Sequence, residues 1–81
     1  ELQAIVTAEP RNAEAWYRLG ATHAVGSQFD AAFDAFLQVV SIDREYREDI
    51  GRKALLSLFD LIGAEDEAVV TARRRLASLL F

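Results

Sequence analysis

The sequence contains no cysteine and no methionine, and it has a single proline among its 81 residues. Without cysteine, these residues can form no disulfide, no thiolate nucleophile and no cysteine-ligated metal site. No apolar run approaches the roughly 18 residues that a membrane-spanning helix needs, and no secretory leader stands at the start. We therefore expect no membrane partner, a cytoplasmic location and, since no initiator methionine is present, a fragment of a longer protein.

Negative charge is concentrated in the first half of the chain. The net charge is -4, and residues 1–43 carry six acidic and two basic side chains, whereas residues 44–81 carry seven of each. Because phosphate contacts need a basic surface, an acidic first half is unsuited to nucleic acid. The hydrophobic fraction of 52% favours a packed core over disorder. We expect one small folded domain with no nucleic-acid partner.

Residues that could perform catalysis or bind a metal are sparse. His23 is the only histidine, and neither a cysteine nor a carboxylate lies four residues from it to share a metal. Asp30 and Asp34 are one helical turn apart, on a side that we expect to face water. The sequence shows no Ser–His–Asp spacing and no glycine-rich phosphate loop. We expect no enzyme active site, no metal and no cofactor in these residues.

Apolar residues recur at helical spacing, and no segment alternates as a β-strand would. Asn12 suits an N-cap and Gly26 the following C-cap, while Ser27 with Asp30 resembles a capping box. Acidic residues near both later helix starts suit the helix dipole. The pattern predicts an all-α fold, an antiparallel array of helical hairpins with about four helices and a partial helix at the start. The end of a partial helix is expected over 1–8. Four full helices follow: the first over about 13–25 and the second from there to about 40. The third starts within 43–51 and stops at Gly63, and the fourth starts within 64–70 and runs to the end.

The stretch from Asn12 to Phe36 has large and small side chains at fixed offsets. After Glu9-Pro10-Arg11-Asn12 it carries Trp16, Leu19-Gly20, Phe29, Ala32 and Phe36. This spacing resembles the tetratricopeptide repeat, a helical hairpin of about 34 residues. We interpret 1–11 as the end of one repeat, 12–43 as a full repeat and 44–81 as a divergent C-terminal hairpin. We expect the two helices of this repeat to approach closely at Gly20. We also expect the core to contain Trp16, Leu19, Phe29 and Phe36.

The divergent hairpin has a resemblance of its own. Its features are Gly51–Leu56, Phe59, Gly63, Arg73–Leu76 and Leu79–Phe81. They are similar to the C-terminal end of YbbN-type proteins, bacterial thioredoxin-like proteins in which tetratricopeptide hairpins follow the thioredoxin domain. The resemblance implies a co-chaperone, or chaperedoxin, that binds unfolded clients and docks onto chaperone machinery such as a chaperonin. It also implies that redox chemistry belongs to a thioredoxin domain outside these residues.

In tetratricopeptide arrays the first helix of each hairpin lines a concave groove. The register assigns to this groove Glu14, Tyr17, Ala21, Ala24 and Val25. None of them is a lysine or asparagine that would clamp a carboxylate tail. We therefore expect a mildly apolar groove suited to extended or unfolded segments. The alternative is that one and a half repeats form a groove too shallow to bind.

The end of the chain combines three arginines with apolar residues. Arg73, Arg74 and Arg75 project about 100° apart on a helix, so we expect at least one to pair with an acid of a neighbouring helix. Together with Leu80 and Phe81 they form a candidate docking helix, through which the domain could also self-associate. The alternative that we favour is a terminal helix folded back onto the third expected helix.

These observations leave three functions open. The first is a protein-interaction module of a thioredoxin-like chaperone, and the second is a generic tetratricopeptide scaffold for one defined peptide partner. The third is an accessory regulatory domain of an enzyme. The region preceding residue 1 would separate them, because a Trp-Cys-x-x-Cys-like element after a strand would favour the first.

Overall fold

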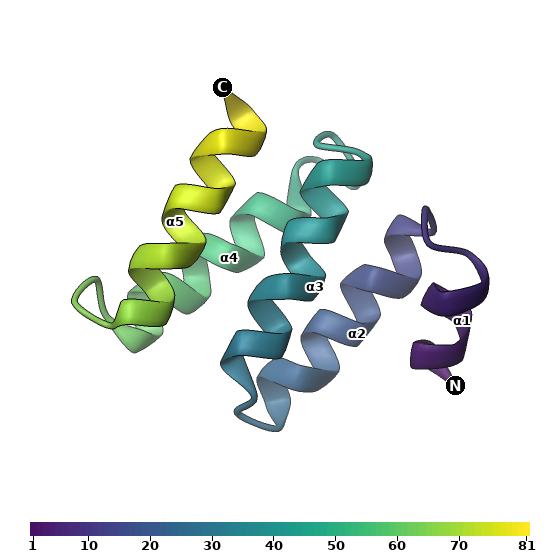
Figure 1. Ribbon diagram of the computed structural model, residues 1–81, viewed down its shortest axis with the longest axis horizontal. Coiled ribbons are helices and arrows are strands. Elements are labelled where there is room, and N and C mark those ends of the chain that lie inside the picture. The colour runs from purple at the N-terminus through teal and green to yellow at the C-terminus, as the bar shows by residue number, and fades with distance from the viewer.

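The computed structural model describes residues 1–81 as five α-helices joined by short turns, with no β-strand (Figure 1). The helices are α1 (Leu2–Ala8), α2 (Ala13–Val25), α3 (Phe29–Ile42), α4 (Ile50–Ile62) and α5 (Glu67–Leu80). α2 and α3 form one hairpin, α4 and α5 form the next, and α1 packs against α2. The all-α hairpin array expected from the sequence is confirmed. No helix combines the length and the apolar character that crossing a membrane would need.

Helix α2 begins and ends where the sequence predicts. The Asn12 side chain is the N-cap, and its Oδ1 accepts a hydrogen bond from the Ala15 backbone N–H at 3.0 Å. Gly26 is the C-cap, but its φ of -82° is an ordinary value that does not require glycine. The left-handed residue of this turn is Ser27, whose φ is 58°.

The turn after α2 is a Schellman motif. The Ser27 N–H donates to the Ala24 carbonyl at 3.0 Å, and the Gln28 N–H donates to the His23 carbonyl at 2.8 Å. Because Ser27 is held in this left-handed turn, it cannot also be the N-cap of α3. The expected capping box of Ser27 and Asp30 is therefore wrong, and α3 begins without a side-chain cap.

The segment before α4 has an unusual backbone. Arg47, Glu48 and Asp49 all have left-handed backbones, with φ of 48°, 59° and 69°. Three such residues in succession cannot belong to a right-handed helix, so α4 begins only at Ile50. This start lies within the predicted range of 43–51, and the acidic residues expected near it lie just ahead of the helix. Asp49 forms an ion pair with Arg52, with its Oδ2 2.5 Å from the Arg52 Nε.

Two glycines allow helices to approach closely. A Cβ added to Gly20 would lie 2.7 Å from Cε1 of Phe36, which confirms the close approach of α2 and α3. A Cβ added to Gly51 would lie 3.0 Å from Cγ1 of Val39, so α4 crosses α3 at a similarly tight contact. Because neither glycine has a side chain, both α2 and α4 can pack closely against α3.

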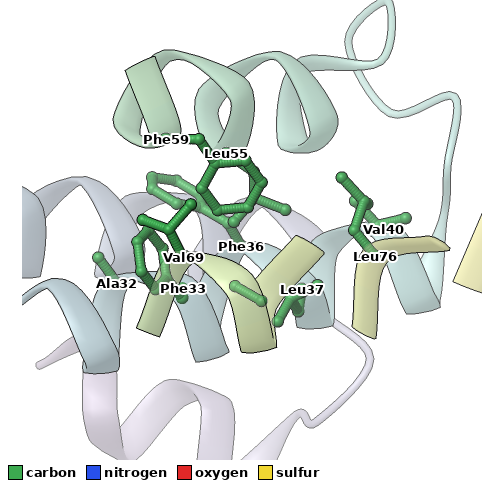
Figure 2. Close-up of a cluster of buried hydrophobic side chains, with 10 residues drawn as sticks. Ala32, Phe33, Phe36, Leu37, Val40, Leu55, Phe59, Val69 and Leu76 are labelled. Carbon is green, nitrogen blue, oxygen red and sulfur yellow. The ribbon is translucent and has the colours of Figure 1, made fainter. Parts of the chain in front are cut away.

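The main core lies between α3, α4 and α5 (Figure 2). The Phe33 and Phe59 rings meet nearly edge to face there, with centroids 5.4 Å apart. A smaller cluster of Val6, Ala15, Leu19 and Ala35 joins α1 and α2 to α3. The main core contains Ala32, Phe33, Phe36, Leu37, Val40, Leu55, Phe59, Val69, Ala72 and Leu76.

The four large motif residues divide between core and edge. Leu19 and Phe36 are buried, as expected. Trp16 and Phe29 are only partly buried, so their assignment to the core is wrong. Trp16 packs over the smaller cluster, and its Nε1 donates to the Pro10 carbonyl at 2.9 Å. Trp16 therefore ties the α1–α2 turn to the smaller cluster while remaining partly exposed.

Helix α5 folds back as favoured, but it packs against α3 as well as α4. Its inward residues, Val69, Ala72 and Leu76, all join the main core. At its end Leu80 is partly buried against this core, whereas Phe81 is fully exposed. The apolar ending is therefore only partly covered by the rest of the chain.

Candidate protein-binding surface

The residues assigned to the groove form one strip along α2. Glu14 is exposed at its start, and Val25 is 89% exposed at its end. Between them, Tyr17 packs on Phe36, with ring centroids 5.6 Å apart and planes tilted by 49°. The middle of the strip is partly buried against the main core and consists of Tyr17, Ala21 and Ala24.

Helix α4 adds a second strip that the sequence analysis did not assign. Ala54, Leu58 and Ile62 are partly buried against the same core, and Leu61 is 73% exposed. The recurrence of apolar residues at 54, 58, 61 and 62, beside the inward face of α4, could have revealed this strip. A helix that needed only one buried face would carry polar side chains at these flanking positions.

The α4 strip lies on the flank of α4 that faces away from the end of α5. The fully buried Leu55 and Phe59 define the inward face of α4, and helical geometry puts Ala54 and Arg52 on opposite flanks of it. Arg52 borders a hollow with Phe81, so the Ala54 flank is directed toward the α2 side. Figure 1 shows α2 and α4 in one layer behind α3 and α5. The two strips therefore lie on helices of the same layer.

The molecule has four main surface hollows, one of which is lined in part by Ile62 of the α4 strip. Three of them follow the seam between α3 and α5, with Arg75, Phe33 and Ala68 among their lining residues. The fourth lies between the loop before α4 and the end of α5. No residue of α2 lines any of these four hollows. The groove assigned to α2 therefore corresponds to none of these hollows and stays a prediction.

The three arginines of α5 have different surroundings. The Arg75 Nη1 lies 2.6 Å from Oδ1 of Asp34 on α3, which confirms the expected ion pair with a neighbouring helix. The Arg73 guanidinium lies over the Phe59 ring, 5.0 Å from its centroid. Arg74 is exposed and forms no ion pair.

The five residues of the candidate docking helix do not share one surface. Arg75 is engaged with α3, and Leu80 packs against the core while its carbonyl accepts a 3.4 Å hydrogen bond from Arg44. The exposed residues among the five are Arg73, Arg74, Arg75 and Phe81, and of the three arginines only Arg75 forms an ion pair.

The acidic and histidine side chains do not gather into a metal site. No group of three or more His, Cys, Asp or Glu side chains is placed to hold an ion. His23 lies in the last turn of α2, partly buried. We therefore direct the functional analysis to the apolar surface.

A helical hairpin array with an open apolar surface defines a helical-repeat protein-binding domain. A sequence model of the tetratricopeptide repeat family matches residues 1–81, the whole length of the chain. The chain belongs to the tetratricopeptide repeat family, whose members generally mediate protein–protein interaction. No curated protein and no solved structure matches it.

Proposed function

We propose that this tetratricopeptide domain binds extended apolar segments of other proteins across the surface between α2 and α4. The observation that carries the proposal is the exposure of Val25 and Leu61, at 89% and 73%. They are the two most exposed large aliphatic side chains of the chain, and each lies in the last turn of the helix that carries its strip. Each buried Å² of apolar surface contributes about 25 cal/mol to binding before the costs of ordering, so these side chains supply a driving force.

The chemistry of the strips favours apolar segments over charged tails. A carboxylate tail would need cations or amide donors, and neither strip carries them. Tyr17 adds the one aromatic surface, an amphipathic residue that is frequent at protein contacts. A partner with several apolar side chains in an extended conformation could therefore bind without a fixed pattern of polar contacts.

Non-native client proteins fit this chemistry, because unfolding exposes extended apolar segments. The similarity of the last hairpin to the C-terminal end of YbbN-type proteins supports the same assignment. The domain would then be the client-binding part of a cytoplasmic thioredoxin-like chaperone, able to deliver clients to chaperone machinery such as a chaperonin. A scaffold for one defined peptide remains the second candidate, because an open groove of a tetratricopeptide array serves that function too.

The test is suppression of aggregation of an unrelated, chemically unfolded protein, followed by light scattering. The variant Val25→Glu/Leu61→Glu places two charges on exposed positions of the strips, so the fold should survive. The control variant Gln3→Glu/Gln38→Glu adds the same charge at exposed sites away from the strips. We expect the parent and the control to suppress aggregation and the strip variant to lose most of this activity. Circular dichroism would verify that all three remain helical.

Two results would contradict this function. Equal suppression by the strip variant and the control would remove the groove as the client site. A folded parent without any effect would mean that the domain is not an autonomous holdase, and the scaffold interpretation would then replace it. A variant lacking Leu79–Phe81 tests whether the end of α5 contributes.

A further inference from the structure

Helices α3 and α5 are the second helices of successive hairpins, and their buried positions recur at a constant offset. Ala32, Ala35 and Val39 of α3 correspond to Val69, Ala72 and Leu76 of α5, and all six side chains are buried. The same offset relates Phe33, Phe36, Leu37 and Val40 to Val70, Arg73, Arg74 and Ala77. The first four are buried in the core shared with α4 and α5, whereas the second four are exposed.

The exposed set defines the outer face of α5: Val70, Arg73, Arg74 and Ala77. On α3 the corresponding face is covered by the next hairpin, whereas on α5 no element covers it. Figure 1 shows α5 at the edge of the array, with no helix beyond it. The next element to pack here would take the place that α4 takes on α3.

The outer face differs from the covered face of α3 in its charge. Arginines stand at the positions of Phe36 and Leu37. The two ion pairs of the molecule involve Arg52 and Arg75, so neither Arg73 nor Arg74 has a carboxylate partner. Arg73 is also oriented by its contact with the Phe59 ring, which reduces the entropy that it would lose on binding. Two uncompensated guanidinium groups therefore flank a strip with small apolar side chains.

From this arrangement we infer that the outer face of α5 binds an amphipathic helix of a partner protein that carries small apolar side chains flanked by carboxylates. The occupant is a helix because α4 covers the equivalent face of α3, and it reaches that face closely through Gly51. It is acidic because guanidinium groups bind carboxylates through two parallel hydrogen bonds. A partner without carboxylates would leave both arginines desolvated and unpaired.

A second copy of this chain is a poorer occupant. A two-fold dimer uses the same patch on both subunits, so it would bring Arg73 and Arg74 of one copy against the same residues of the other. Like charges juxtaposed at an interface oppose association. The outer face therefore favours a different protein with the opposite charge.

The experiment uses two fluorescently labelled helical peptides with the same leucine–alanine stripe, one flanked by glutamates and the other by lysines. Their binding to the chain is measured by fluorescence anisotropy at low and at raised salt. We expect the glutamate peptide to bind in a salt-sensitive manner and the lysine peptide not to bind. Arg73→Glu/Arg74→Glu should weaken binding of the glutamate peptide by at least about tenfold and create affinity for the lysine peptide.

Two further variants keep the test decisive. Arg74→Glu alone changes an exposed residue that forms no ion pair and leaves the Arg73–Phe59 contact intact, so we expect this variant to remain folded, which circular dichroism verifies. Arg11→Glu/Arg18→Glu makes the same change of net charge at exposed arginines in the first half of the chain and should leave the binding constant unchanged.

Three outcomes would overturn the inference. The first is equal binding of both peptides, and the second is equal weakening by the two double variants, which would indicate net charge alone. The third is a dimer in light scattering that Arg74→Glu abolishes, which would assign the face to a second copy. The groove variant Val25→Glu/Leu61→Glu must keep peptide binding, so failure here is distinguishable from failure of the proposed function.

Discussion

At the scale of single residues, Ser27 adopts a left-handed conformation that costs a residue with a Cβ about 1–2 kcal/mol. Ser27→Gly should relieve this strain, partly offset by the greater freedom of glycine in the unfolded chain. We expect the free energy of unfolding to rise by about 0.5–1 kcal/mol. Urea unfolding followed by circular dichroism measures the change.

Ser57→Gly provides the matched control for Ser27→Gly. Ser57 is exposed within α4, where glycine is a poorer helix former, so this variant should lose about 0.5 kcal/mol. Opposite signs for the two variants are the expected result. A similar loss in both would contradict the left-handed assignment of Ser27.

Single residues also show where sequence reasoning works and where it stops. The role of Gly20 could be predicted because a repeat motif links it to Phe36, and the added Cβ would lie within 2.7 Å of that ring. The role of Gly26 could not be predicted so well, because glycine marks a helix end without fixing which residue takes the left-handed conformation. In this turn it is Ser27, one residue later, that takes the left-handed conformation.

At the scale of helices, Asp66 initiates α5. Its Oδ1 accepts hydrogen bonds from the Ala68 and Val69 backbone N–H groups at 2.8 and 3.4 Å. Asp66→Ala should reduce the free energy of unfolding by about 1 kcal/mol, because two helix-end donors lose their acceptor. Glu65→Ala removes the same charge at an exposed neighbour that is outside the helix and should cost less. Thermal unfolding of the two variants compares their losses of stability. Equal losses would mean that the effect comes from charge and not from capping.

Helix bounds were predictable where a cap side chain or a glycine marks the end, as at both ends of α2. The start of α4 could be predicted only to lie somewhere within residues 43–51. An acid-rich segment ahead of an apolar run is compatible with a helix start and with a loop. The left-handed backbone over residues 47–49 is set by the chain's reversal between α3 and α4, which no local preference encodes.

At the scale of the whole molecule, the repeat register assigned a strip along α2 but gave no assignment for the strip along α4. Tyr17, Ala21 and Ala24 could be assigned because the motif fixes the faces of α2. The α4 strip belongs to a hairpin that does not follow the motif, so its faces depend on how α4 packs against α3. The division of Arg73, Arg74 and Arg75 among three environments likewise follows from the packing of α5 against both α3 and α4.

The two clusters of the molecule should respond unequally to mutation. Trp16 is partly buried over the small cluster that joins α1, α2 and α3, whereas Phe59 is fully buried in the main core. Phe59→Ala should cost about 3–5 kcal/mol, a large part of the stability of a small domain. Trp16→Ala loses a partly exposed ring, so we expect about half that cost and a cooperative transition at lower temperature.

Thermal unfolding followed by circular dichroism at helical wavelengths separates these cases. The contrast matters because the repeat motif alone would place Trp16 at the centre of the core, where its removal would unfold the domain. The structure instead makes Phe59, which lies outside the full repeat and beneath Arg73, the residue whose loss is most damaging. If Trp16→Ala abolishes the transition while Phe59→Ala retains one, the stability of the array resides in its first hairpin and the small cluster, contrary to the packing described above.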